Sequence, residues 1–221
     1  MVIIMLGAPA SGKGSVAEIL SQEFNIPAIS SGDIFRKNIS EGTELGKKAN
    51  EYMTKGLLVP DDVTVELIAS RLLADDVKDG LILDGFPRTV VQAEKLDNML
   101  KAQNKKIDIV VILETPEEEI LERIVNRRVC TNSSCKTIYN TVLNPSQVDG
   151  ICDKCGSPLM QRDDDTLEKA KNRLAVYYKE TAPVADYYKG TGALYSTVLS
   201  KSVNRMKNEV AADVISYLKN K

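Results

Sequence analysis

The feature that most constrains this chain is a glycine-rich run directly after a short apolar segment. Residues 2–6 read Val-Ile-Ile-Met-Leu, and residues 7–15 read Gly-Ala-Pro-Ala-Ser-Gly-Lys-Gly-Ser. A strand that turns sharply into a helix leaves several backbone N–H groups unpaired, and the helix dipole adds partial positive charge at the same point. Such a turn binds phosphate, so the pattern predicts a strand, a nucleoside triphosphate loop and a helix at the start of the chain.

Individual residues of this loop have separate expected roles. Gly7 and Gly12 let the backbone curl, Lys13 is placed to bridge the outer phosphates, and Ser15 offers a hydroxyl to a magnesium ion. In the general pattern the lysine is followed directly by Ser or Thr, whereas here Gly14 is interposed. A simple glycine-rich turn is the alternative, but the order of strand, loop, lysine and hydroxyl favours nucleotide binding.

Composition narrows the class of protein. The 221 residues carry 29 Lys and Arg against 31 Asp and Glu, and they include no histidine. Without an excess of positive charge, nucleic acid is not expected as a partner. The lack of histidine excludes a Ser-His-Asp triad, so catalysis must rest on lysine, arginine, carboxylates or a metal ion. No leader-like or membrane-spanning apolar run is visible, so we expect a cytoplasmic protein without a membrane partner.

Short apolar runs rich in β-branched residues alternate with segments of helical period. The runs cover residues 2–6, 81–83 and 107–113, with a weaker one at 193–199 and a further candidate at Ile29. Strands that alternate with helices predict an α/β fold with a parallel sheet. The continuous rather than alternating hydrophobicity of residues 109–113 is typical of a strand that helices cover on both faces.

Capping residues and periodicity predict the later helices. Thr115-Pro116-Glu117-Glu118 places a capping residue, a proline and a glutamate where they favour a helix start. We expect helices from there to about residue 128, over 163–178, after Pro183 and over 203–218.

Two segments interrupt the α/β pattern. Residues 30–59 are expected to be helical, and residues 126–163 are rich in Cys, Gly, Asn and Pro. The second segment contains all four cysteines, Cys130, Cys135, Cys152 and Cys155, as two close pairs around a run that can form a hairpin.

This cysteine spacing predicts a structural, zinc-ribbon-like site. Zinc takes four thiolates in a tetrahedron, and two short turns bring them together without a large core. Disulfides or free structural thiols are the alternatives, and a catalytic thiol is disfavoured because nothing else suggests redox chemistry.

Asp84 and several arginines are candidates for the phosphate chemistry. Asp84 ends a predicted buried strand, where parallel sheets place their ligands, so we expect it to face magnesium through water. A helix-capping or turn aspartate is the alternative. Arg88 follows four residues later. Arg123 and Arg127 are four residues apart on a predicted helix.

A second spacing adds two more arginines. Arg162 and Arg173 are eleven residues apart, which is one face if both are helical. Surface salt bridges are the ordinary alternative for each arginine, but five of them favour a clamp for developing phosphoryl charge.

Together these motifs resemble the adenylate kinase family, in the long bacterial form whose lid carries zinc. The matching motifs are Gly-Ala-Pro-x-x-Gly-Lys-Gly at 7–14, Ser31-Gly32-Asp33 with Arg36, Asp84-Gly-Phe-Pro-Arg88 with Gln92, Arg127-Arg128, and Arg162 with Arg173. The resemblance implies a P-loop kinase core at 1–29, 60–125 and 164–221, a helical AMP-binding insertion at 30–59 and a zinc-binding lid at 126–163. It also implies movement of that lid.

The resemblance also assigns substrate contacts. For ATP it implies Ala10, Ser11, Gly12, Lys13, Gly14, Ser15, Arg123, Arg127, Ile138, Tyr139 and Lys201. For AMP it implies Ser31, Arg36, Leu57, Leu58, Val59, Gly85, Phe86, Pro87, Arg88, Gln92, Arg162 and Arg173. Gln92 would read the adenine edge by paired hydrogen bonds. The implied catalytic residues are Lys13, Asp84, Arg88, Arg127, Arg162 and Arg173.

The implied reaction is the reversible transfer of the γ-phosphoryl group of MgATP to AMP, which gives two ADP. The expected partners are ATP, AMP and ADP, the expected cofactors are Mg²⁺ and a structural Zn²⁺, and the expected state is a monomer. Two alternative functions stay open. One is another nucleoside monophosphate kinase, for UMP, CMP or GMP, although Gln92 and the long cysteine-bearing lid favour AMP. The other is a non-catalytic nucleotide-binding module, which the set of arginines disfavours. Residues 199–202, Leu-Ser-Lys-Ser, depart from the glycine turn that many relatives have there.

Overall fold

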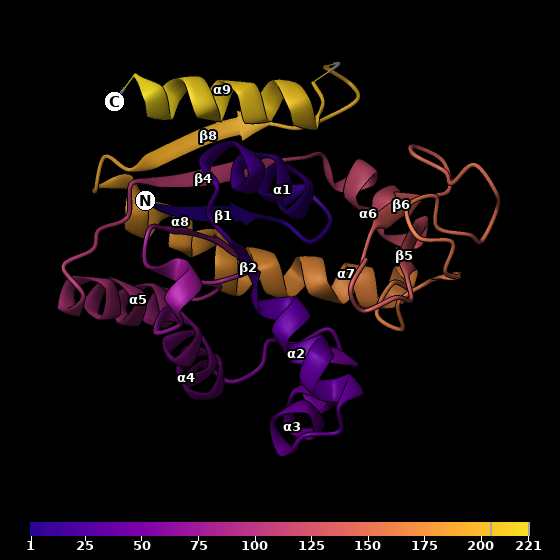
Figure 1. The fold of residues 1–221 in the computed structure, drawn as a ribbon, viewed down its shortest axis with the longest axis horizontal. Coiled ribbons are helices and arrows are strands. Elements are labelled where there is room, and N and C mark those ends of the chain that lie inside the picture. Colours follow the sequence, from indigo (N-terminus) through magenta and orange to yellow (C-terminus); the bar gives the residue numbers. More distant parts are fainter. Residues whose placement is uncertain (204, 221) are drawn as a thin grey trace.

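A five-stranded parallel sheet forms the centre of the molecule in a computed structural model that describes residues 1–203 and 205–220 (Figure 1). The strands are β1 (Val2–Gly7), β2 (Ala28–Ser30), β3 (Leu81–Asp84), β4 (Ile109–Glu114) and β8 (Leu194–Val198). They lie in the order β2-β3-β1-β4-β8, and each neighbouring pair is parallel. Each apolar run expected to form a strand does so, which confirms the α/β fold.

The central strand β1 shows why the apolar runs are continuous. Val2 and Ile4 pack into the apolar cluster on one face of the sheet, whereas Ile3 and Met5 pack into the cluster on the other. All four are at most 2% exposed. Because successive side chains of a strand point to opposite faces, a strand covered on both sides buries every residue. Each such side chain contributes about 1.5–3 kcal/mol to the stability of the sheet.

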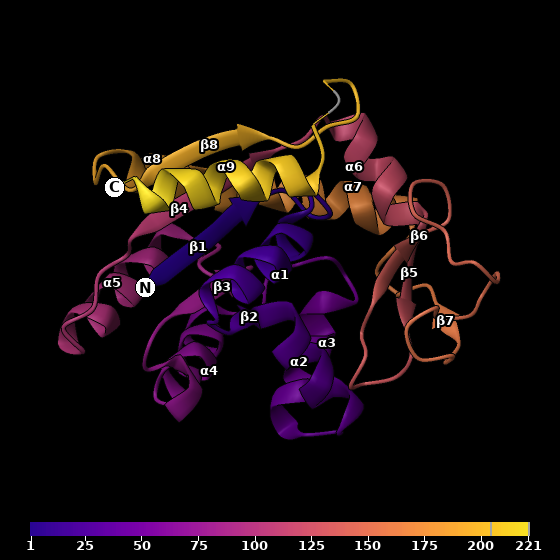
Figure 2. The ribbon, with the colours of Figure 1, turned by 45° about the horizontal axis from the view of Figure 1, so that its top comes forward.

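Helices cover both faces of this sheet (Figure 2). On one face lie α1 (Lys13–Phe24) and α9 (Lys207–Lys219), side by side. On the other lie α4 (Asp61–Leu72), α5 (Val90–Ala102) and α8 (Ala182–Lys189). Helices α6 (Glu117–Val125) and α7 (Leu167–Val176) pack against each other beyond the carboxyl ends of the strands, and a π-helical turn at Tyr177–Thr181 joins α7 to α8. None of the helices in the described residues is long and apolar enough to cross a membrane.

Helix α6 is shorter than expected and starts differently. Pro116 occupies the N-cap position, where no side chain caps the helix. The hydroxyl of Thr115, predicted to cap this helix, instead donates to the carbonyl oxygen of Leu199 at 2.8 Å. The helix ends at Val125 rather than near residue 128, because the chain continues as a β-strand from Arg127.

The boundaries of two later helices also differ from expectation. Helix α7 starts at Leu167, with Thr166 as its cap, instead of at the acidic run 163–165. Helix α9 starts at Lys207 rather than at 203. Before α9, Ser200 and Arg205 form an isolated antiparallel β-bridge, in which the N–H of Arg205 donates to the Ser200 carbonyl at 3.0 Å. The expected start of α9 includes residue 204, which lies outside the described residues.

Two short helices form the insertion between β2 and α4. They are α2 (Ser31–Ser40) and α3 (Glu44–Met53). The side chain of Ser30 caps α2 and that of Thr43 caps α3. Phe35, Ala49 and Val59 form a separate buried cluster there, so the insertion has a small core of its own.

The cysteine-bearing segment forms a separate three-stranded antiparallel sheet. Its strands are β5 (Arg127–Cys130), β6 (Ile138–Asn140) and β7 (Leu159–Met160), in the order β6-β5-β7. We call residues 127–160 the cysteine module. It lies at the carboxyl end of the parallel strands, next to α6 and α7 (Figure 1).

Candidate active site

The glycine-rich run forms the loop between β1 and α1. Gly7 and Gly12 have φ angles of 141° and 103°, which glycine adopts without strain. A Cβ on Gly7 would lie 2.6 Å from the Leu113 carbonyl oxygen, and a Cβ on Gly12 would lie 2.9 Å from Leu199 Cδ1. Helix α1 starts at Lys13, so the loop presents the free backbone N–H groups of a helix amino terminus, as a phosphate site requires.

Lys13 lies across this loop. Its ammonium group donates to the carbonyl oxygens of Gly7 at 2.8 Å and Ala8 at 2.7 Å. Burial, together with the charges of nearby arginines, lowers the pKa of Lys13 to about 8, although the charge of Asp84 acts in the opposite direction. The group is therefore a cation in surroundings that disfavour its charge, and an anionic ligand would relieve that cost.

Asp84 and Arg88 lie at the carboxyl end of β3, beside the loop. Asp84 is the last residue of β3, and a Cβ on Gly14 would lie 3.3 Å from its Oδ2. Burial raises the pKa of Asp84, although the charges of Lys13 and Arg88 oppose the rise. Arg88 donates from Nε to the Gly85 carbonyl at 2.8 Å, and burial lowers the pKa of Arg88 to about 10. The structure thus brings the predicted carboxylate and guanidinium to the edge of the sheet where the loop lies.

Two further arginines are paired with adjacent aspartates where α7 meets the cysteine module. Arg127 donates from Nε to Asp165 Oδ2 at 2.7 Å and from Nη2 to the other oxygen of the same carboxylate. Asp165 is 0% exposed. Arg173 Nη1 lies 3.0 Å from Asp164 Oδ2 and 3.4 Å from Asp165 Oδ1. These pairs fix the positions of both guanidinium groups.

The arginines converge, but they do not share helices as their spacing predicts. Arg127 begins strand β5 and does not share α6 with Arg123. Arg162 precedes the cap of α7 and does not share that helix with Arg173. Burial, together with the charges of Arg36 and Arg127, lowers the pKa of Arg162 to about 9. Tertiary contacts, not helical periodicity, therefore bring these cations together.

Cationic side chains outnumber carboxylates in the region between the phosphate loop, the end of β3 and the start of α7. The cations are Lys13, Arg36, Arg88, Arg127, Arg162 and Arg173, and the carboxylates close to them are Asp33, Asp84, Asp164 and Asp165. After burial itself, neighbouring cations are among the causes that lower the pKa values of Lys13, Arg88, Arg162 and Arg173. A partly buried cluster with excess positive charge is suited to a polyanion such as the phosphate groups of nucleotides.

A cavity beside this cluster lies between the insertion and the turn after β3. Its lining residues are Ser31, Gly32, Phe35, Met53, Leu57, Leu58, Val59, Thr64, Gly85, Arg88 and Gln92. Most residues predicted for AMP are among them. Phe86 and Pro87 continue the turn from Gly85, and Phe86 is fully buried. The lining residues that were not predicted as AMP contacts are Gly32, Phe35, Met53 and Thr64. Isolated apolar and hydroxyl residues in helices carry no signal for a ligand.

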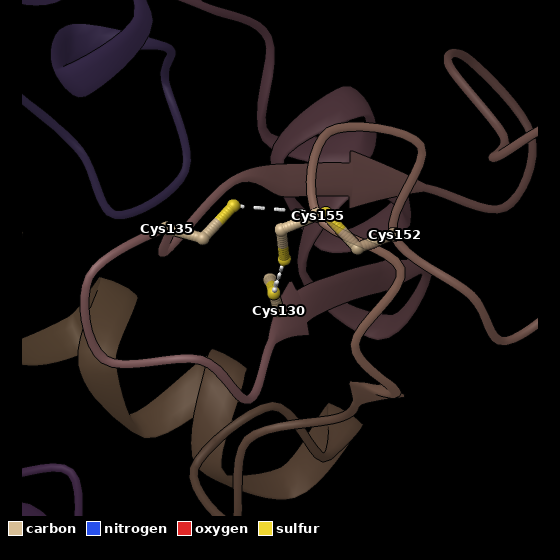
Figure 3. A group of neighbouring side chains, drawn as sticks. All are labelled: Cys130, Cys135, Cys152 and Cys155. Carbon is tan, nitrogen blue, oxygen red and sulfur yellow. Dashed lines mark hydrogen bonds between the residues drawn. The ribbon is translucent and has the colours of Figure 1, made fainter.

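The four cysteines converge within the cysteine module (Figure 3). Their Sγ atoms all lie within 4.8 Å of one another, and two of the separations are 3.4 Å, from Cys130 to Cys155, and 3.7 Å, from Cys135 to Cys152. A disulfide would need about 2.05 Å, so all four are free thiols. Thiolates on a tetrahedral zinc ion, with bonds of about 2.3 Å, lie about 3.8 Å apart. The predicted cluster is thus confirmed, and its donor set and spacing fit zinc.

The two residues of the module that were predicted to touch ATP differ in exposure. Ile138 is 47% exposed, whereas Tyr139 is 7% exposed. The hydroxyl of Tyr139 lies 3.6 Å from Cys152 Sγ and accepts from the N–H of Asp153 at 2.8 Å. The side chain of Tyr139 therefore belongs to the interior of the module, which leaves its backbone for any contact with a ligand.

Comparisons with known proteins agree with this geometry. A family model described as adenylate kinase matches residues 5–193. A protein named adenylate kinase from Caldicellulosiruptor bescii is 52% identical over 194 residues, which cover 88% of this chain and 89% of the relative. Proteins of the same name from Caldicellulosiruptor saccharolyticus and Oceanobacillus iheyensis are 50% and 48% identical, over 95% and 100% of this chain and 97% and 100% of the relative, respectively. The chain belongs to the adenylate kinase family.

The segment that departs from many adenylate kinases, residues 199–202, is fixed to helix α6 by a carboxylate. Glu119 accepts from the hydroxyl of Ser200, from the N–H of Lys201 at 3.2 Å and from Arg123 Nη2 at 2.9 Å. The side chains of Arg123 and Glu119 are 11% and 13% exposed. Sequence reasoning missed Glu119, because a glutamate in the first turn of a helix is an ordinary dipole partner.

Arg123 and Lys201, both predicted for ATP in adenylate kinases, have protein partners here. Arg123 donates to the carbonyl oxygens of Ser11 and Leu199, each at 3.3 Å, and so joins the phosphate loop to the segment 199–202. Lys201 pairs with Glu122 at 2.8 Å. Of the other loop residues predicted for ATP, Ala10 has a φ of 58°, Ser11 is fully buried and Ser15 lies in the first turn of α1.

Proposed function

We propose that this chain catalyses the reversible transfer of the γ-phosphoryl group of MgATP to AMP, giving MgADP and ADP. The observation that carries the proposal is the cluster of lysine and arginine side chains between the phosphate loop and the cavity lined by Ser31, Arg88 and Gln92. Two phosphate-bearing substrates would meet at this cluster, one from each side. Close relatives named adenylate kinase support the choice of ATP and AMP.

The chemistry needs positioning and charge more than a protein nucleophile. An oxygen of the AMP phosphate forms the new bond to the γ-phosphorus while the bond from that phosphorus to the bridging oxygen of ADP breaks. The attacking oxygen is already anionic near neutral pH, so the main barrier lies in aligning two anions that repel each other. Lys13 and Arg88 would lower this repulsion from opposite sides, and Arg127, Arg162 and Arg173 would stabilise charge on the transferring group.

Magnesium fits the carboxylate and hydroxyl beside the loop. Asp84, at the end of β3, and Ser15, in the first turn of α1, would hold the ion, Asp84 through water. When bound, the ion neutralises phosphate charge and orients the phosphate oxygens.

The domain division follows from the same proposal. The core would comprise residues 1–29, 60–125 and 164–221, the AMP-binding domain residues 30–59, and the lid residues 126–163. Adenylate kinases are enzymes whose lid closes over the substrates, and we propose the same movement for residues 126–163. The four thiols would hold a structural zinc ion that keeps the lid folded, with no open position for chemistry.

The test is ADP formation from MgATP paired in turn with AMP, GMP, UMP and CMP. We expect strong preference for AMP, and loss of at least about 10²-fold in turnover for Lys13→Ala, because it removes one preorganised charge from the transferring phosphate. The substitution should leave the fold intact, as measured by circular dichroism. Preference for another monophosphate would identify a different nucleotide kinase. Binding of ATP without any transfer would indicate a binding module, and near wild-type turnover of Lys13→Ala would refute the role of that lysine.

A further inference from the structure

Gln92 is buried in the wall of the cavity next to the cation cluster. It is 1% exposed and lies in the first turn of α5, where its backbone N–H donates to the Thr89 hydroxyl at 3.1 Å. Ser31, Val59 and Arg88 line the same cavity. A primary amide in such a wall has two N–H groups and a carbonyl oxygen with two lone pairs, so it can pair with a base edge in either of two orientations.

Two contacts fix which way this amide points. Gln92 Nε2 donates to Asp61 Oδ1 at 2.7 Å, and Gln92 Oε1 accepts from the backbone N–H of Arg88 at 2.7 Å. The other oxygen of Asp61 accepts from the Thr89 hydroxyl at 3.0 Å. An ionised carboxylate only accepts and a backbone N–H only donates. Rotation of the amide by 180° would therefore set a carbonyl oxygen against Asp61 and an N–H against the N–H of Arg88.

The fixed orientation leaves one N–H and one lone pair of Gln92 for a ligand, in a set order. Adenine offers a ring-nitrogen acceptor at N1 beside an amino donor at position 6. The 6-oxopurines, hypoxanthine and guanine, offer the reverse order, a donor at N1 beside an acceptor at position 6. We consider a base whose ribose and phosphate are held in one place. If the amide of Gln92 could rotate, it would pair with adenine or with a 6-oxopurine. A fixed amide pairs with only one of these two kinds of base.

We propose that Asp61 is a positioning residue for base selectivity: by locking the amide of Gln92, it makes the monophosphate site accept a 6-aminopurine and reject a 6-oxopurine. The proposal rests on the proposed function, in which this cavity binds AMP. Asp61 does not touch the substrate in this account and acts through Gln92. A site built around fixed donors and acceptors rejects a mismatched base because buried polar groups are then left unpaired.

Asp61 also begins helix α4, so a purely structural role has to be separated from selectivity. Both Asp61 and Asp62 lie in the first turn of α4, where a negative charge favours the helix dipole. Asp61 is partly buried against Gln92, whereas Asp62 is exposed. Asp62→Asn therefore removes the same charge from the same helix turn without touching the amide, and it is the matched control for Asp61→Asn.

The experiment compares kcat/KM for AMP and IMP at saturating MgATP, since IMP differs from AMP only at the edge that Gln92 would read. We expect Asp61→Asn to lower the AMP-to-IMP ratio about tenfold, the worth of one hydrogen bond to a charged group. The Arg88 N–H remains as the second constraint, so selectivity falls without vanishing. Asp62→Asn should keep the wild-type ratio, and the KM for ATP should not change in either variant. Asp61→Ala, which also frees the amide, is the second variant in case Asp61→Asn does not fold.

A double-mutant cycle with Gln92→Ala tests whether Asp61 acts through Gln92. In the Gln92→Ala background, Asp61→Asn should leave the AMP-to-IMP ratio unchanged. An unchanged ratio in single variants that still phosphorylate AMP would overturn the role of Asp61 and leave the proposed function standing. An equal fall in both Asp61→Asn and Asp62→Asn would reduce the effect to helix stability and also overturn it. Failure of the wild-type protein to phosphorylate AMP would overturn the proposed function itself, and this inference with it.

Discussion

The central sheet and the cysteine module are stabilised in different ways. Strand β1 buries aliphatic side chains on both faces of the sheet, in two separate apolar clusters. The apolar cluster of the cysteine module consists of Cys130, Tyr139 and Cys152, with Cys135 and Leu159 partly buried against them. Three of these five residues are themselves thiols of the proposed metal site. Burial holds one part of the chain and the proposed metal ion would hold the other, so each part should unfold under a different treatment.

The largest expected effect is the loss of the module on removal of metal. Structural zinc contributes on the order of 10 kcal/mol in small zinc-binding peptides, and the module has little else to hold it folded. We expect about one zinc ion per chain by elemental analysis. Chelation under reducing conditions should raise amide hydrogen exchange throughout residues 127–160 while the strands of the central sheet stay protected.

Cys152→Ser provides the matched variant, since it removes one thiolate with little change of volume. It should reproduce the effect of chelation. Metal-free protein with unchanged thermal stability and unchanged exchange in the module would show that the thiols do not hold a structural ion, and the comparison between the two regions would then fail.

The next largest expected effect is on the ion pair between Arg127 of the cysteine module and Asp165, which precedes α7. Asp165→Asn removes the buried charge that pairs with Arg127, whose side chain is 11% exposed. Breaking one side of a buried ion pair typically costs about 3–5 kcal/mol, and urea unfolding followed by circular dichroism measures it. Asp163→Asn is the control, because Asp163 is an exposed aspartate in the same connection. Equal stability of the two variants would mean that the ion pair contributes nothing to stability.

A change of pH probes a group that works against the stability of the core. The pKa of Lys13 is about 8 in the folded protein, below its ordinary value of 10.5. Between these values the unfolded chain binds more protons than the folded chain, so Lys13 makes stability rise with pH there. The slope is at most about 1.4 kcal/mol per pH unit. Denaturant unfolding of wild type and Lys13→Met between pH 7.5 and about 10 measures the difference, and parallel stability curves would contradict the low pKa.

The smallest expected effect is the loss of stability in Ile4→Val, which removes a single methylene from the central sheet. Ile4 is 0% exposed in β1, and Ile→Val in a core typically costs about 1 kcal/mol. Urea unfolding should show this loss, while hydrogen exchange in the cysteine module stays as in the wild type. Faster exchange in the module at this small destabilisation would mean that the two regions unfold together.

The sequence predicts the sheet and the cysteine cluster well because their signals are local. Runs such as residues 109–113 are continuous and β-branched, so they fit a strand buried on both faces. The four cysteines come as two close pairs, a spacing that favours a zinc site. The end of α6 could not be predicted in this way. Arg127 continues the helical pattern, but its pairing with Asn140 of β6 makes it the first residue of β5.

Supporting residues of the site were hidden for a different reason. Asp61 and Glu119 are carboxylates in the first turn of a helix, where either is expected without any function. Only the contacts distinguish them: Asp61 reaches the amide of Gln92, and Glu119 reaches the backbone of Lys201. Both contacts join segments that are far apart in the chain, so periodicity and capping rules give no access to them.

The place where the cysteine module connects to α6 and α7 determines how insertions and deletions in the module affect the rest of the chain. Gln161 donates from Nε2 to the carbonyl oxygens of both Val125 and Asp165, at 3.3 Å and 2.8 Å. The chain therefore leaves the core and returns to it at nearly the same place. The whole module is therefore an excursion of the chain that starts at the end of α6 and comes back to the same point before α7. Insertions or deletions inside it need not move the sheet, and a short linker in its place would leave the two helices where they are.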